Sequence, residues 1–115
     1  MMFLRICWGP QRTNTFNVNW NIINAQSYVV VTASEGGEDV DAGQVLLSTA
    51  SPKRFIGDAR FTVCNIAPQP HKLSFHVLID FDHPLVLWTD IIVFDGVKDM
   101  MRVSDPGSVD IDIPD

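Results

Sequence analysis

Several residue types are scarce in this 115-residue chain, and each scarcity excludes a class of structure. There are only 2 Glu, 7 Leu and 6 Ala, residues that usually fill helices, against 13 Val and 10 Ile. The β-branched side chains favour strands, whereas the 12 Asp compete for backbone hydrogen bonds and favour turns. The composition therefore excludes an all-helical protein and predicts an all-β one.

Basic residues are also few, and long apolar runs are lacking. Eight Lys and Arg stand against 14 Asp and Glu, so the formal charge is -6, and no basic cluster offers a surface for nucleic acid. No run approaches the ~20 apolar residues of a membrane helix, and the first residues lack a signal-peptide pattern. We expect a cytoplasmic protein without membrane insertion, with a secreted form as the alternative.

The chain has two cysteines, Cys7 and Cys64. We expect two buried thiols, with a disulfide between them as the alternative. Together with Trp20 they fall near the Cys–Trp–Cys spacing of antibody domains. The position two before Cys64 is Thr62, however, where that pattern requires a tyrosine. Membership of the antibody-domain family is therefore not predicted.

Apolar stretches recur between turn signals along most of the chain, and period-2 alternation makes several of them candidate strands. The clearest alternation covers 72–81, and the stretch 85–94 is apolar on both faces, as in a central strand. The other candidates are 3–8, closed by Gly9-Pro10, and 16–22, 27–33, 44–49 and 60–66.

Seven candidate strands with short links predict an antiparallel β-sandwich of seven to eight strands, immunoglobulin-like or related in topology. We expect residues 1–98 to form the sandwich domain and 99–115, with five Asp and one Arg, to form an acidic C-terminal segment. Within that segment, 109–113 alternates between apolar residues and Asp. This alternation predicts an edge strand or a tail that orders by strand addition to a partner.

Candidate catalytic groups do not form a convincing constellation. Cys64 could use His71 or His76 as a base, but it lies in a β-branched stretch without a glycine-rich elbow or a following helix. No Gly-x-Ser-x-Gly motif is present. We therefore expect no enzymatic activity and no obligate cofactor.

The acidic loops suggest calcium as the alternative ligand. Asp80 and Asp82 stand at the end of a predicted strand, and Asp39 and Asp41 lie in an acidic, glycine-rich loop. Oxygen ligands from two such loops could bind Ca²⁺ if both loops lay at one end of the sandwich.

An amide row suggests carbohydrate as another alternative ligand. Asn17, Asn19 and Asn21 alternate with apolar residues, so the pattern places them on one face of a strand, where amides can bind sugar hydroxyls. Trp20 points to the opposite face of that strand, so its ring cannot stack on a sugar bound by the amides.

The best hypothesis from the sequence is a non-enzymatic interaction module that binds a protein partner or self-associates as a homo-oligomer. The two-sided apolar strand and the alternating C-terminal segment provide more strand surface than a lone small sandwich needs. A module that binds Ca²⁺ or carbohydrate is the alternative.

Overall fold

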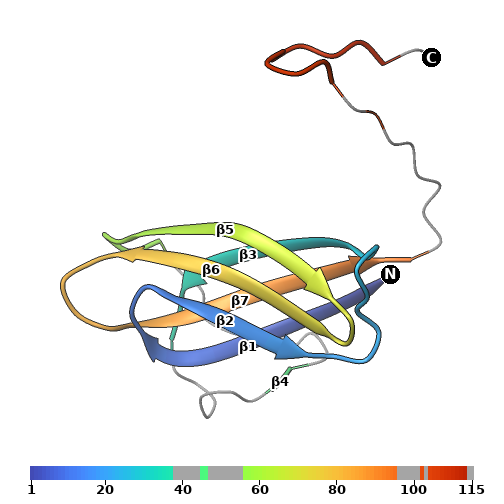
Figure 1. Cartoon of the computed structure of the whole chain (residues 1–115). Coiled ribbons are helices and arrows are strands. Elements are labelled where there is room, and N and C mark those ends of the chain that lie inside the picture. Colours follow the sequence, from blue (N-terminus) through green and yellow to red (C-terminus); the bar gives the residue numbers. More distant parts are fainter. Residues whose placement is uncertain (38–44, 47–55, 96–101, 103, 114–115) are drawn as a thin grey trace.

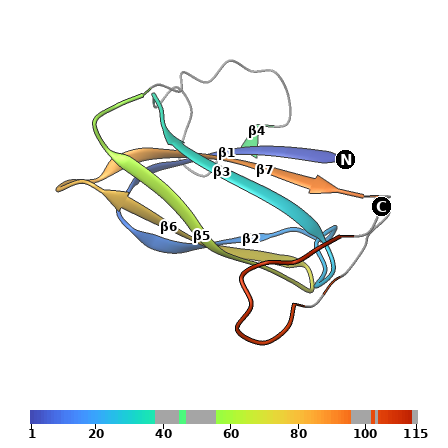
Figure 2. The ribbon, with the colours of Figure 1, turned by 90° about the horizontal axis from the view of Figure 1, so that it is seen from above.

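The computed structural model describes residues 1–37, 45–46, 56–95, 102 and 104–113. These residues form an all-β protein whose strands lie in two layers (Figures 1 and 2). The strands are β1 (Met2–Gln11), β2 (Asn14–Asn19), β3 (Tyr28–Glu35), β4 (Val45–Leu46), β5 (Arg60–Gln69), β6 (Lys72–Asp80) and β7 (Leu85–Phe94).

Six long strands make two antiparallel sheets of three strands each. Sheet 1 has the order β3-β7-β1, extended at its edge by the two-residue β4, and sheet 2 has the order β2-β6-β5. The expectation of an all-β sandwich is confirmed. The count of seven to eight full strands is wrong, because β4 pairs with β1 only at Arg5 and Ile6.

The immunoglobulin-like topology is also wrong. That fold places the first, second, fifth and fourth strands in one sheet, whereas here the first strand pairs with the last. Chain segments β1–β2 and β6–β7 each cross from one sheet to the other, and they pair with each other in both sheets. Long-range pairing between the two ends of the domain therefore decides the topology.

Between the sheets lies a core built from the alternating positions of the strands. Sheet 1 contributes Leu4, Ile6, Val31, Leu87, Ile91 and Val93, and sheet 2 contributes Phe16, Val18, Leu73, Phe75, Val77 and Ile79. The ring of Trp8 packs against this core, with its centroid 5.0 Å from that of Phe16. Its indole N–H donates to Thr89 Oγ1 at 2.8 Å, so this fully buried hydroxyl has a partner.

Strand β1 continues through Gly9-Pro10, where the sequence predicted its end. A β-bulge shifts the register between Cys7 and Gly9, and Gly9 has φ 73°, a conformation that glycine adopts without a steric penalty. Pro10 pairs with Val86 on β7, while β4 pairs with β1 only farther back along the strand. Among the described residues, the missing N–H of Pro10 therefore breaks no ladder on the side of β4.

An ion pair links the two central strands on the outer face of sheet 1. Arg5 lies directly opposite Asp90, and its Nε and Nη2 donate to the two carboxylate oxygens at 2.6 and 3.0 Å. The hydrogen bond to Asp90 raises the pKa of the Arg5 guanidinium, although partial burial opposes this shift. Asp90 is buried, so removing the cation would leave a carboxylate in a poorly solvated place.

We expect Arg5→Met to lower the free energy of unfolding by about 2–4 kcal/mol, because it breaks a bidentate pair whose acid is buried. Guanidinium unfolding at neutral pH measures this loss. The matched control is Arg12→Met, since Arg12 is exposed and donates to the Asp82 carbonyl at the long distance of 3.5 Å. The control should change stability by less than about 0.5 kcal/mol. Equal losses in the two variants would contradict the role given to the ion pair.

Candidate functional site

The outer face of sheet 1 carries side chains in rows that run across three strands. Antiparallel register places Phe3, Ile92 and Val30 side by side, and the next row holds Arg5, Asp90 and Thr32. A third row holds Cys7, Trp88 and Ser34. Neighbours in such a row are close enough to act as one surface.

These rows divide the face into a covered half and an open half. In the covered half Cys7 and Trp88 are fully buried, and the Trp88 indole N–H donates to the Gly37 carbonyl at 2.9 Å. In the open half Phe3 is 49% exposed and Val30 is 43% exposed. The Arg5–Asp90 pair lies between the halves, and the Arg5 guanidinium carbon lies 5.5 Å from the centre of the Phe3 ring. We call Phe3, Ile92, Val30, Tyr28 and Phe94 the open apolar face.

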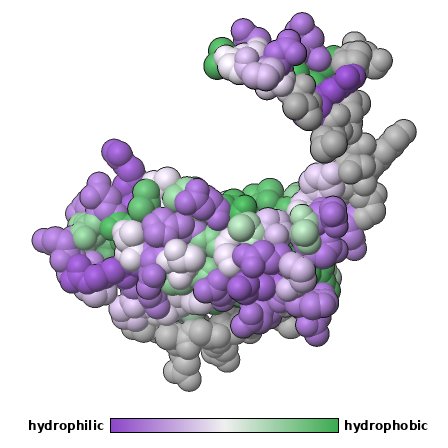
Figure 3. Space-filling model, in the orientation of Figure 1, coloured by the Kyte–Doolittle hydropathy of each residue, from purple (hydrophilic) through white to green (hydrophobic). Residues whose placement is uncertain are grey.

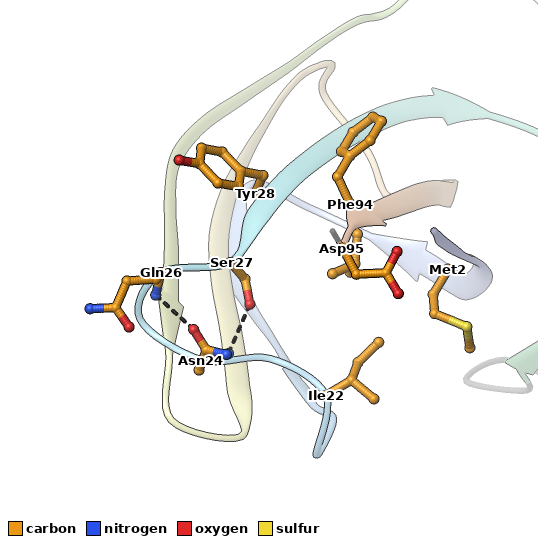
Figure 4. A pocket seen from close by; sticks show the side chains of 9 residues that line it. Met2, Ile22, Asn24, Gln26, Ser27, Tyr28, Phe94 and Asp95 are labelled. Carbon is orange, nitrogen blue, oxygen red and sulfur yellow. Dashed lines mark hydrogen bonds between the residues drawn. The ribbon is translucent and has the colours of Figure 1, made fainter. Parts of the chain in front are cut away.

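A pocket of about 320 Å³ adjoins the open apolar face at the end of the sandwich (Figure 4). Its apolar wall consists of Met2, Ile22, Tyr28, Val93 and Phe94, and its polar wall of Asn24, Gln26, Ser27 and Asp95. Tyr28 and Phe94, which are opposite each other on β3 and β7, belong to both the pocket and the open apolar face. The two features therefore form a continuous surface.

The polar wall of the pocket is shaped by a hydrogen-bonded turn between β2 and β3. The backbone N–H of Asn24 donates to Ser27 Oγ at 2.9 Å, and the backbone N–H of Gln26 donates to Asn24 Oδ1 at 2.8 Å. Asp95 pairs with the N-terminal ammonium of Met1, which lowers the pKa of the Asp95 carboxyl. Ser27 Oγ, Asn24 Oδ1 and the Asp95 carboxylate thus each have a partner within the chain.

The outer face of sheet 2 has the opposite character. Figure 3 views the molecule from this side, and hydrophilic residues cover much of it. Asn17 and Asn19 lie there as predicted, whereas Asn21 lies beyond the end of β2, which stops at Asn19. Asn17 Oδ1 accepts from the Ser74 hydroxyl at 2.6 Å. The predicted amide row is therefore two residues long, and one of them already has a partner within the sheet.

The predicted calcium ligands are only partly within the described residues. Asp80 ends β6 and Asp82 lies in the exposed turn that follows, where its carboxylate contacts His83 Nδ1 at 2.9 Å. Asp39 and Asp41 lie outside the described residues. Over the described parts of the chain, no three His, Cys, Asp or Glu side chains gather closely enough to hold a metal ion.

The two cysteines are free thiols on different sheets. Cys7 is buried on sheet 1, whereas Cys64 is half-buried on sheet 2, so the alternative of a disulfide between them is wrong. Cys64 pairs with His76 across β5 and β6, and His76 Nδ1 lies 2.9 Å from Thr15 Oγ1. The sequence thus found a pair that shares a face, and one of the two ring nitrogens of His76 is hydrogen-bonded to Thr15.

Sequence reasoning missed the residues of the open apolar face. It recognised that 85–94 is apolar on both sides, but it did not identify Phe3 and Val30 as the exposed neighbours of Ile92. The available signal was that three different strands each carry an apolar residue at a position whose side chain points away from the core. Only the strand order places these positions in one row.

Comparisons with known proteins identify no family for this chain. No model of a known protein family matches the chain, and neither a curated protein nor a solved structure was found to resemble it. In the described part of the chain there is also no helix with the length and apolar character needed to cross a membrane.

We expect the two thiols to differ sharply in reactivity toward iodoacetamide. The native protein should gain one alkyl group, on half-buried Cys64, and a second on Cys7 only after unfolding in guanidinium. Intact-mass analysis counts the groups, and Cys64→Ser serves as the control that should remain unmodified when native. Rapid modification of Cys7 in the native protein would contradict the burial of this part of sheet 1.

Proposed function

We propose that this chain is a non-enzymatic interaction module that binds a protein, in the first place a second copy of itself, through the open apolar face. The observation that carries the proposal is the row Phe3–Ile92–Val30, which runs in register across three strands with exposed side chains at both ends. Contiguous apolar patches on a folded protein commonly mark interaction surfaces.

Several properties favour a protein over a small ligand as the partner. The row lies on the flat face of a sheet, and the adjoining pocket of about 320 Å³ is near the lower limit for small-molecule sites. Phe3 and Tyr28 are aromatic, and aromatic residues are enriched at protein interfaces. The Arg5–Asp90 pair at the edge of the row would supply a polar rim.

Calcium and carbohydrate stay as alternatives with less support. The carboxylates of the described residues do not gather at one point. On the polar face of sheet 2, the side chains that share rows with Asn17 and Asn19 are Ser74, Ala67, Lys72 and Gln69, none of which can stack on a sugar ring. We therefore assign the function to the apolar face.

Sedimentation equilibrium over a wide range of protein concentrations tests the proposal. We expect the unmodified chain to dimerise. Phe3→Glu should weaken the dimer by roughly tenfold or more, because it places a charge where the dimer would bury an apolar side chain. The matched control is Leu78→Glu, which changes a similarly exposed residue, at 43%, on the outer face of sheet 2. This control should leave the dimer unchanged.

Two results would contradict the proposal. One is a strict monomer at the highest concentration measured, and the other is an equal effect of Phe3→Glu and Leu78→Glu. Circular dichroism of both variants should match that of the unmodified chain, since both side chains are half exposed in the sandwich.

A further inference from the structure

The C-terminal segment carries large apolar side chains that the rest of the molecule does not cover. In Figure 1 residues 104–113 of this segment lie apart from the sandwich. Val109, Ile111 and Ile113 are 96%, 50% and 52% exposed, and they alternate with Asp110 and Asp112. An extended chain with this pattern has one apolar and one acidic side, which suits a strand that is half buried.

Part of one sheet edge offers such a strand a place to pair. Among the described strands, β3 pairs with β7 alone and stands at one end of sheet 1. Its last residues, 33–35, lie beside residues 56–61, with which they line a small pocket. Among the described residues, 28–32 therefore form the open part of this edge. This stretch contains three consecutive valines and neither proline, glycine nor charge, so nothing in it opposes pairing.

The edges of sheet 2 are less suited to receive a strand. β5 contains a bulge with Asn65 at φ 55°, and Pro68 lacks the N–H that a ladder needs. β2 is six residues long, and its exposed positions are all polar, with Asn17 and Thr15 already bonded to β6 side chains. Of the edges at β3, β5 and β2, the open part of β3 thus has the fewest protective features.

We propose that residues 109–113 of one copy add as a strand beside residues 28–32 of a second copy. This inference rests on the self-association in the proposed function and specifies a second contact, at the edge of sheet 1 rather than on its face. The donor and acceptor stretches have the same length, and backbone hydrogen bonds would join them as in other strand additions.

The side-chain pattern sets which way the added strand faces. Beside β3, its apolar side lies against the partly buried Val29 on β3 and Phe61 and Val63 on β5, which belong to the rim of the core. Asp110 and Asp112 then point to solvent, because an unpaired carboxylate is costly to bury. β3 and β5 lie close to each other along this side of the sandwich, so one added strand would contact both.

A second copy is the donor because residues 109–113 are exposed in their own chain. The side chain of Val109 is almost fully exposed, and the alternating stretch contains no strand in its own chain. If each copy donates one segment and accepts one, the two copies form a closed twofold dimer in which neither segment is left unpaired.

The experiment combines sedimentation equilibrium with hydrogen–deuterium exchange on the full chain. We expect Ile111→Asp/Ile113→Asp to weaken the dimer by about a hundredfold, since it removes two apolar side chains that the dimer would bury. The matched control, Asp110→Asn/Asp112→Asn, keeps the apolar side intact and should dimerise at least as well as the unmodified chain. Both pairs of positions are exposed in the single chain, so neither variant should impair folding.

Exchange identifies where the segment binds. Amides within 28–32 should become slower to exchange as protein concentration rises, and this protection should be lost in Ile111→Asp/Ile113→Asp. Protection of 28–32 that is independent of concentration, yet lost in the variant, would mean that each segment binds its own chain. This result would overturn the proposed pairing between two copies. A dimer that survives the Ile substitutions but is lost in Phe3→Glu would overturn this inference while leaving the proposed function standing.

Discussion

The central constraint on this structure is that β7 is apolar on both faces and lies between two other strands. Its inward side chains, such as Leu87 and Ile91, are fully buried in the core between the sheets. Its outward side chains also need cover, because apolar surface left in water is unfavourable. The packing of the two sheets covers the inward side chains along the whole strand. The outward Trp88 is fully buried, whereas Ile92 is only half-buried and lies between the exposed Phe3 and Val30.

The ion pair makes this division of the outer face possible. Arg5 and Asp90 hold the centre of the face with two hydrogen bonds, and they separate the buried Trp88 from the exposed row at Phe3. A charged pair in the middle of a uniformly apolar face would be costly, whereas at a boundary the guanidinium can reach solvent. The position of the pair therefore fits a face of which one half is covered within the chain and the other half is left exposed.

Local sequence patterns predicted the strands better than their arrangement. The bounds of β7 and most of β6 follow from apolar content and alternation, which are properties of neighbouring residues. The continuation of β1 past Pro10 depends on the bulge before Gly9, and its pairing with β7 joins the two ends of the sandwich. No local pattern encodes either fact. For the same reason the amides and carboxylates were recognised as candidates, but the row through Phe3, Ile92 and Val30 was not.

The acidic residues of the C-terminal segment gain a physical role in this picture. A segment apolar on both sides would need burial on both sides, as β7 does, and would tend to aggregate when exposed. Asp110 and Asp112 leave only one apolar side, which an edge between two sheets can cover while the carboxylates remain solvated. The face of sheet 1 and the edge at β3 are separate surfaces that meet at Val30. Contact at the face and strand addition at the edge can therefore occur in one dimer, with each covering apolar side chains that the other leaves exposed.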